Sequence, residues 1–428
     1  MFFISQGGVM NSKKIRAGLM AGVVGASTLL TLSTQANAAG PVVLNFWSRA
    51  AQADFIKSVG DEFNASQSKI QVKVTTIPDA QFVQKVSTSS LSGSAPDITS
   101  VDLILVPYFA KNGVFADLTS YANNLSFKKL LSPAHMKLGA YKGKQYALPF
   151  TSEASVLFWN KDLFKKAGLD PEKAPATWDE VTKDAKAVTA LGGDTKGYYF
   201  SGACGGCQIF TFMPFIWAAG GDILTADGKP TYDNKIVGQA LDFYKNLVTS
   251  GYVDSSAKTD NGASFAAPFA TGKVGMVAAG AFYVGALKAH PEINYGVTPI
   301  PGKTAGQIGS FAGGDDIAIL KGTKHPKEAQ AFLDWALNAG QKFLAKKAVV
   351  PIRSDVSKSD YVPLDPRYKV ISDMMAVGKT PWSTVYTPLI ADAQSPWITM
   401  QQGSIFGNDT AAAQKKAQEA ALAIVKKS

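Results

Sequence analysis

The alternation of strand-like and helix-like segments over residues 41–102 constrains the fold more than any other feature of this chain. Phe55, Val59 and Phe63 recur at helical spacing and share one face of a helix. The neighbouring segments are short apolar runs or alternate apolar and polar residues, as strands do. Strands are expected at 41–47, 69–77 and 95–102, with helices at 52–66 and 80–91 between them. This order predicts an α/β fold with a largely parallel sheet.

Similar elements continue through the second half of the chain. A turn-forming segment at 227–234 precedes a helical segment in which Val237, Leu241 and Val248 share one face. Further elements are expected as a strand at 315–320, a helix at 325–337 and an Ala-rich helix at 409–427. Because we find no low-complexity linker, we expect two lobes to be joined by several short crossings.

The first 38 residues have the order of regions of a secretory signal peptide. Lys13, Lys14 and Arg16 precede an apolar run that is too short to span a bilayer, and Ala36 and Ala38 are the small residues of a cleavage site. A buried core helix is the alternative, but it does not account for this order. We therefore expect a periplasmic protein. The lack of a cysteine at the cleavage site favours a soluble protein over a lipid-anchored one.

The length of the remaining chain, about 390 residues, is more than one core usually supports and predicts two lobes. Removing the three basic residues of the signal lowers the net charge from +10 to +7 (10 − 3 = 7). The remaining positive charge is scattered as single lysines among acidic residues. Since there is no Arg-rich run, nucleic acid is not an expected partner.

Hydrogen-bonding and aromatic side chains follow three of the predicted strands, where parallel sheets carry their binding sites. The side chains are Trp47, Ser48 and Arg49 after the first strand, Asp102 after the third, and Thr151, Ser152 and Glu153 further on. Sugars are bound by this mixture, because aromatic faces stack on C–H surfaces while carboxylates and hydroxyls bind hydroxyl groups. Each loop alone also has an ordinary interpretation, since a Trp after a strand is more often part of the core.

An enzymatic function has less support in the sequence. Asp102 and Glu153 could form the carboxylate pair of a secreted glycosidase, but no spacing sets their separation. The chain has no G-x-S-x-G motif, and residues 309–316 lack the context of a phosphate-binding loop. The three histidines, His135, His290 and His325, are far apart in the sequence. We therefore expect no metal site and no cofactor.

Four segments resemble a known family. Residues 143–181 give the closest match, and 95–119, 269–288 and 311–337 support it. The similarity runs in order over essentially the whole chain after the signal. It is to the periplasmic solute-binding proteins of carbohydrate ABC importers, the extracellular solute-binding protein family 1, to which maltose-binding protein belongs.

The resemblance implies a fold of two α/β lobes, each a mixed, mainly parallel sheet flanked by helices, with the ligand cleft between them. Lobe I is expected to contain 39–151 and 312–370, and lobe II 152–311 and 371–428. The expected function is that of a monomer that binds a neutral mono- or oligosaccharide or a polyol by lobe closure and delivers it to the permease subunits of an ABC transporter. The alternatives are an anionic solute such as glycerol 3-phosphate, the glycosidase, and a surface adhesin.

Several residues match positions at which this family contacts its solute. Glu153 stands where the family has an acidic sugar ligand, Asp102 where relatives bind hydroxyls, and Phe282 where they place an aromatic platform. The remaining matches are Gln208, Phe210, Gly313, Gly314, Asp315 and Trp382. In this candidate shell Arg49 is the one cation against Asp102, Glu153 and Asp315, which suits a neutral ligand better than a phosphorylated one.

The only two cysteines, Cys204 and Cys207, are separated by a glycine pair. Export favours a disulfide between them, because disulfides persist outside the cytosol and Gly205 and Gly206 allow so short a ring to close. A thioredoxin-like redox pair is expected in a much smaller domain, and a metal site lacks further ligands, so both are less favoured. Since the resemblance places Gln208 and Phe210 in the cleft, we predict that the bridge stiffens a ligand-facing loop.

Overall fold

The computed structural model of the chain describes residues 40–427. The signal peptide expected at 1–38 lies outside these residues. None of the described helices combines the length and the apolar character that crossing a membrane requires.

Eight strands of the described chain form one mixed sheet, in the order β2-β1-β3-β12-β6-β8-β7, with β9 also paired with β6. The strands are β1 (Val42–Arg49), β2 (Ile70–Ile77), β3 (Ile98–Asp102), β6 (Leu148–Asn160), β7 (Lys196–Tyr199), β8 (Val274–Gly280), β9 (Tyr295–Thr298) and β12 (Ala312–Ile319). Pairing is parallel for β1–β2, β1–β3 and β7–β8, whereas β6 and β12 are antiparallel to each strand beside them. The sheet is mixed, as predicted, but the expectation that it is mainly parallel is not met, because its parallel pairs are confined to the two ends and antiparallel pairs form the centre.

The first strand–helix alternation lies close to where the apolar pattern predicts it. Helix α1 spans Ala53–Ser66 and α2 spans Asp79–Ser92, between the strands β1, β2 and β3. Val59 and Phe63 of α1 are buried, as their shared face requires. The predicted helices of the second half are also present, as α10 (Lys235–Thr249), α13 (Pro326–Ala336) and α18 (Thr410–Lys426).

Side-chain caps set the beginning of several helices. Thr177 accepts a hydrogen bond from the backbone N–H of Glu180 (3.1 Å) at the start of α7 (Trp178–Thr189). Asn234 accepts one from Ile236 (2.8 Å) at α10, and Asp409 accepts one from Ala412 (2.9 Å) at α18. Each cap satisfies a backbone donor that has no partner within the helix.

Buried side chains cover both faces of β1, β3 and the C-terminal half of β12, and we call them the first core. Phe332 of α13 packs edge-to-face against Phe63 of α1 (ring centroids 4.9 Å apart) and against Phe46 of β1 (5.4 Å). The other helices around this core are α2, α3 (Val106–Lys111), α4 (Thr119–Asn123), α5 (Pro133–Leu138) and α14 (Ala339–Lys346).

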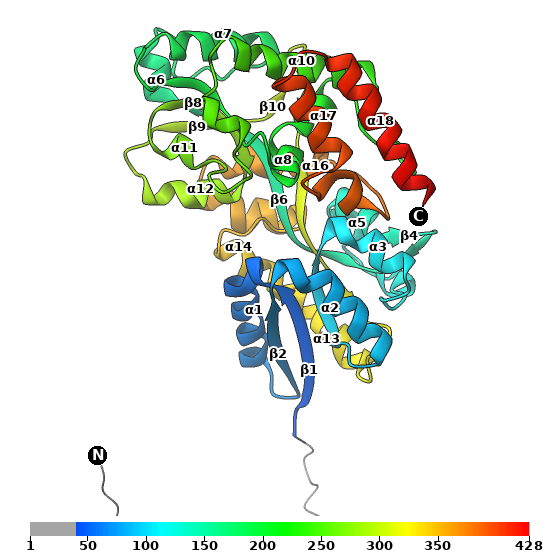
Figure 1. The fold of residues 1–428 in the computed structure, drawn as a ribbon. Coiled ribbons are helices and arrows are strands. Elements are labelled where there is room, and N and C mark those ends of the chain that lie inside the picture. The colour runs from blue at the N-terminus through cyan, green and yellow to red at the C-terminus, as the bar shows by residue number, and fades with distance from the viewer. Residues whose placement is uncertain (1–39, 428) are drawn as a thin grey trace, which may run out of the picture. The chain divides into compact units, whose positions relative to one another are not determined.

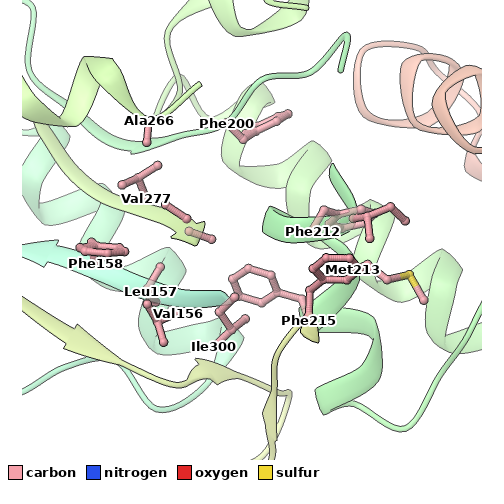
Figure 2. Close-up of a cluster of buried hydrophobic side chains, with 14 of the residues drawn as sticks. Val156, Leu157, Phe158, Phe200, Phe212, Met213, Phe215, Ala266, Val277 and Ile300 are labelled. Atoms are coloured by element: carbon pink, nitrogen blue, oxygen red, sulfur yellow. The ribbon is translucent and has the colours of Figure 1, made fainter. Parts of the chain in front are cut away.

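The second core surrounds the C-terminal half of β6 together with β7, β8 and β9. Figure 2 shows part of it, with Val156, Leu157 and Phe158 of β6 close to Val277 of β8. The helices around it are α6 (Lys161–Lys166), α7, α8 (Gly205–Thr211), α9 (Met213–Ala218), α10, α11 (Ala267–Ala270), α12 (Phe282–Ala286), α16 (Tyr368–Val377), α17 (Pro396–Ile405) and α18. A stacked pair, Phe212 and Trp397 (5.8 Å), ties α17 to this core.

Strand β6 belongs to both cores and passes between them in Figure 1. Leu148 and Phe150 are buried in the first core, whereas residues from Ala154 onward are buried in the second. The chain passes back from the second core to the first along the N-terminal half of β12, because Phe311 lies in the second core and Ile317 in the first. After α14 the buried residues from Val356 to Met374 belong to the second core, earlier than the expected boundary at 371.

Candidate functional site

A cavity of about 650 Å³ lies between side chains of the two cores and the strands that cross between them. Its lining residues are Arg49, Gln52, Asp102, Ile104, Glu153, Gly206, Cys207, Ile209, Phe210, Phe265, Phe282, Phe311, Gly314, Tyr386 and Ala391. We call this cavity the cleft. Its volume is in the range of ordinary small-molecule sites.

Arg49 is the cation of the cleft and is held by carboxylates. It ends β1, and its guanidinium pairs with Asp315 of β12, with Asp102 (3.1 Å) and, at longer range, with Asp79 (3.8 Å). Burial alone would lower the pKa of Arg49, but the charges of Asp315 and Asp102 outweigh burial and hold that pKa above its ordinary value. Asp315 is fully buried and also accepts a hydrogen bond from Ser100 (2.7 Å).

Two carboxyl groups line the cleft itself, those of Asp102 and Glu153. Asp102 ends β3 and accepts a hydrogen bond from the backbone N–H of Ile104 (3.2 Å); burial raises its pKa, although Arg49 opposes the shift. Glu153 of β6 accepts a hydrogen bond from the backbone N–H of Phe282 (3.3 Å). Burial raises the pKa of Glu153 to about 8. Glu153 is therefore mostly protonated at neutral pH and can both donate and accept a hydrogen bond.

Four phenylalanines provide much of the remaining surface. Phe282 at the start of α12 is 49% exposed, and the ring of Phe265 lies 5.8 Å from it. Phe210 of α8 packs against Phe311, with ring centroids 4.4 Å apart. The cleft therefore combines carboxyl groups with aromatic rings.

Two glycines let these rings approach the strands. A Cβ at Gly280 would lie 2.5 Å from the ring of Phe282 and 3.1 Å from Glu153 Oε2, so this position brings ring and carboxyl together. A Cβ at Gly313 would lie 2.8 Å from the ring of Phe210. Larger residues at either position would displace a lining ring.

The predicted disulfide between Cys204 and Cys207 is present, with Cα atoms 5.2 Å apart. It closes the first turn of α8, where the backbone N–H of Cys207 lies 3.1 Å from Cys204 Sγ. Gly206 and Cys207 line the cleft. The bridge thus lies beside the candidate site, and its effect on ligand binding stays a prediction.

The structure brings half of the predicted site residues together at the cleft. These are Arg49, Asp102, Glu153, Phe210, Phe282 and Gly314. Asp315 and Gly313 do not line the cleft but contact residues that do. Asp315 is the buried partner of Arg49, and Gly313 leaves room for the ring of Phe210.

The other predicted site residues point elsewhere. Trp47 precedes Arg49 by two positions and packs on the first core, with the Lys85 ammonium 5.2 Å from its ring. Ser48 is fully buried. Gln208 is also fully buried, and its side chain donates to the carbonyl of Ser201 (2.9 Å). Trp382 lines a separate cavity of about 320 Å³.

Several cleft residues escaped the sequence analysis. Gln52 and Ile104 come just after strand ends that were singled out, so a wider window around Arg49 and Asp102 would have included them. Phe265 lies in a turn and Tyr386 at the start of a short π-helix, and no periodicity in the sequence marks them. Only the folded chain shows that they face the same space.

The described residues contain no group of three or more His, Cys, Asp or Glu that could hold a metal ion. His135 is a core residue in α5, with Nδ1 2.8 Å from Ser132 Oγ and Nε2 3.1 Å from the carbonyl of Thr151. Burial lowers its pKa to about 4, so it is neutral at ordinary pH.

Known proteins resemble this chain over most of its length. A putative binding protein of Brucella abortus is 27% identical over 353 residues, which cover 82% of this chain and 84% of the relative. The multiple sugar-binding protein of Streptococcus mutans is 29% identical over 397 residues, covering 84% and 87%. The crystal structure of the cyclic α-maltosyl-1,6-maltose binding protein of Arthrobacter globiformis superposes with a TM-score of 0.78 at 25% identity and covers 91% of this chain and all of that one.

These likenesses confirm the two-lobe periplasmic-binding-protein fold. Residues 47–343 match the model of the family described as bacterial extracellular solute-binding protein, a family of binding proteins and not of enzymes. The chain therefore belongs to the bacterial extracellular solute-binding protein family.

Proposed function

We propose that this protein acts in the periplasm, binds a neutral carbohydrate between its two lobes and delivers it to the permease subunits of an ABC transporter. The carbohydrate is a mono- or oligosaccharide or a polyol. The observation that carries this proposal is the charge arrangement of the cleft, in which Arg49 is already bound by Asp315 and Asp102.

That arrangement disfavours an anionic solute. Among the described residues that line the cleft, Arg49 is the one cation, and a bound phosphate would compete with the carboxylates around it. Phosphate sites normally supply free arginines, lysines or helix N-termini. A hydroxyl group can instead donate to Asp102 and both donate to and accept from a protonated Glu153.

Lobe closure provides the mechanism. We assign 40–151 together with 312 to about 350 to lobe I, and the rest of the described chain to lobe II, on the basis of the two cores. A solute that contacts both lobes favours the closed state by its differential affinity, and about 5.5 kcal/mol moves the equilibrium from 1:99 to 99:1. Hydrogen bonds that the solute donates to Asp102 and exchanges with Glu153, combined with ring contacts, are of that order.

The names of two relatives support the carbohydrate class, since one is a multiple sugar-binding protein and the other binds a cyclic maltosyl-maltose. We test the proposal by a thermal-shift screen of the purified mature chain with mono-, di- and trisaccharides, polyols and glycerol phosphates. A neutral carbohydrate is expected to raise Tm and to be recovered unchanged. A shift with glycerol 3-phosphate alone, or release of reducing ends from a glycan panel, would overturn it.

A further inference from the structure

Most hydrogen-bonding side chains of the cleft and most of its apolar side chains come from different cores. The polar side chains Arg49, Gln52 and Asp102 come from the first core, at the ends of β1 and β3. What we call the apolar wall is made by Ile209, Phe210, Phe265 and Phe282. The first three belong to or pack against the second core, which also contributes Tyr386 to the cleft, while Glu153 and Phe311 lie on the crossing segments. A hydroxyl facing that wall would lose its hydrogen bonds to water without replacement.

The apolar wall is more than a single stacking platform. Trp217 stacks on Phe311 (6.4 Å, interplanar angle 8°), Phe311 packs on Phe210, and Phe265 packs on Phe282. Phenylalanine rings bring no hydrogen-bonding group, unlike Trp and Tyr. An exposed apolar surface of this kind in a cleft indicates a ligand that covers it.

The segments that carry the rings of Phe265 and Phe282 are fixed by contacts with the second core. Phe265 has a positive φ of 41°, which is unfavourable for a bulky residue and persists only where the surroundings impose it. Its neighbour Ala266 is buried in the second core (Figure 2), and the carbonyl of Ala266 accepts a hydrogen bond from the hydroxyl of Tyr283 (2.5 Å). Because Tyr283 follows Phe282, this bond fixes the two ring-bearing segments to each other.

The loop before Phe265 is fixed by Asp260. Its carboxylate accepts hydrogen bonds from Tyr199 (2.8 Å), Ser201 (2.7 Å) and the backbone N–H of Gly262 (3.0 Å). These hydrogen bonds maintain the strained backbone at Phe265, which places its ring at the cleft. The boundary between the two chemistries lies at Phe282, whose backbone N–H donates to Glu153 while its ring begins the apolar wall.

We infer that the solute is a glycoside with an apolar aryl or alkyl substituent. Its hydroxylated part is bound by Asp102 and Glu153, and its substituent covers Phe265 and Phe282. The inference rests on the proposed carbohydrate-binding function and narrows its ligand class. It accounts for the extent of the apolar wall, which a fully hydroxylated sugar would leave partly uncovered.

The test compares matched methyl, hexyl and phenyl glycosides of glucose, galactose, mannose, xylose, maltose and cellobiose, as both anomers, by isothermal titration calorimetry on the mature chain. The methyl glycoside controls for the blocked anomeric position. For the sugar that binds, we expect the phenyl or hexyl glycoside to bind at least tenfold more tightly than the methyl glycoside. Phe265→Ala and Phe282→Ala should each lower that ratio at least threefold.

Leu91→Ala is the matched control, since Leu91 of α2 is 89% exposed and does not line the cleft. It should leave the ratio unchanged. Equal binding of methyl, hexyl and phenyl glycosides, or an unchanged ratio in both Phe variants, would overturn the inference and leave the carbohydrate proposal intact. If neither these glycosides nor the sugars and polyols of the thermal-shift screen bind, both proposals fail.

Discussion

Arg49 and Asp315 form a buried ion pair across 266 positions of the sequence. Arg49 ends β1 and Asp315 lies on β12, with β3 between them in the sheet. Among the described residues that line the cleft, Arg49 is the one cation. The pair thus fixes it to β12. Positioning of Arg49 and stability of the sheet depend on the same contact.

Asp315→Ala should lower both stability and solute affinity. The substitution removes the fully buried acceptor of the Arg49 guanidinium and of the Ser100 hydroxyl. Because Asp102 still pairs with Arg49, the loss should be smaller than the cost of an uncompensated buried charge, about 3–5 kcal/mol. Chemical denaturation and calorimetric titration measure the two effects. Asp61→Ala is the control, because its pair with Lys57 is exposed and contributes at most about 0.5 kcal/mol. Equal losses in the two variants would contradict the assigned role.

Solute affinity should fall as the pH rises through about 8. The pKa of Glu153 is raised to about 8 by burial, so the carboxyl is protonated below that pH and loses its donor above it. The limiting fall is about tenfold for each pH unit. Glu153→Gln keeps a neutral donor and should bind with little pH dependence between pH 6 and 9, whereas Glu153→Ala should bind at least tenfold more weakly at pH 7. The same pH slope in Glu153→Gln as in the original chain would reject this role.

Asp316 should make the fold less stable as the pH rises. Both of its carboxyl oxygens are buried without a hydrogen-bond partner among the described residues, and burial raises its pKa well above the ordinary value. The folded chain therefore keeps a proton that the unfolded chain loses above about pH 4, so the free energy of unfolding falls with rising pH by up to about 1.4 kcal/mol per unit.

Asp316→Asn removes this titration. It should raise Tm at pH 8 and change it much less at pH 4, as measured by calorimetry at the two values. Asp194→Asn serves as the control, because the Asp194 side chain is 84% exposed. If Asp316→Asn leaves the pH dependence of Tm as it was, Asp316 is not the group responsible.

Reducing the Cys204–Cys207 bridge should change solute affinity more than stability. A four-residue ring contributes only about 2 kcal/mol by loop entropy, whereas Gly206 and Cys207 line the cleft. We expect a several-fold loss of affinity with a small fall in Tm on adding reductant. The variant with both cysteines changed to serine should no longer respond to the reductant. A large fall in Tm with unchanged affinity would show that the bridge acts on the whole fold.

The strand ends carried most of the predictive information about the site. Arg49 and Asp102 could be named because parallel strands place the residues at their ends at one edge, but this rule does not account for Glu153, which lies within β6, a strand antiparallel to its neighbours. Trp47 could not be placed by that rule, since it lies two residues before the end of β1, on the same face as Arg49, and packs against the first core instead of reaching the cleft. Gln208 and Phe210 show the same limit on α8, where one side chain is buried and the other lines the cleft.

Phe265 and Tyr386 were beyond prediction for a different reason. One lies in a turn and the other at the start of a short π-helix, far apart in the sequence, and their side chains meet in the cleft only through tertiary packing. The antiparallel insertion of β12 between β3 and β6 is likewise a long-range pairing that local periodicity does not contain. The helices and strands could therefore be predicted well from the sequence, but which of them pack or pair with one another could be predicted only in part.

The place of β12 between β3 and β6 has a consequence for how the chain matures. During synthesis, Ile98–Asp102 leaves the ribosome more than 200 residues before Ala312–Ile319, the segment that completes its hydrogen bonds. Until then β3 offers an open edge to any extended segment nearby, which is the usual route to aggregation of nascent chains. A chain that ends before β12 should thus depend on chaperones, and shortening it from the C-terminus should yield insoluble fragments and not a smaller working lobe.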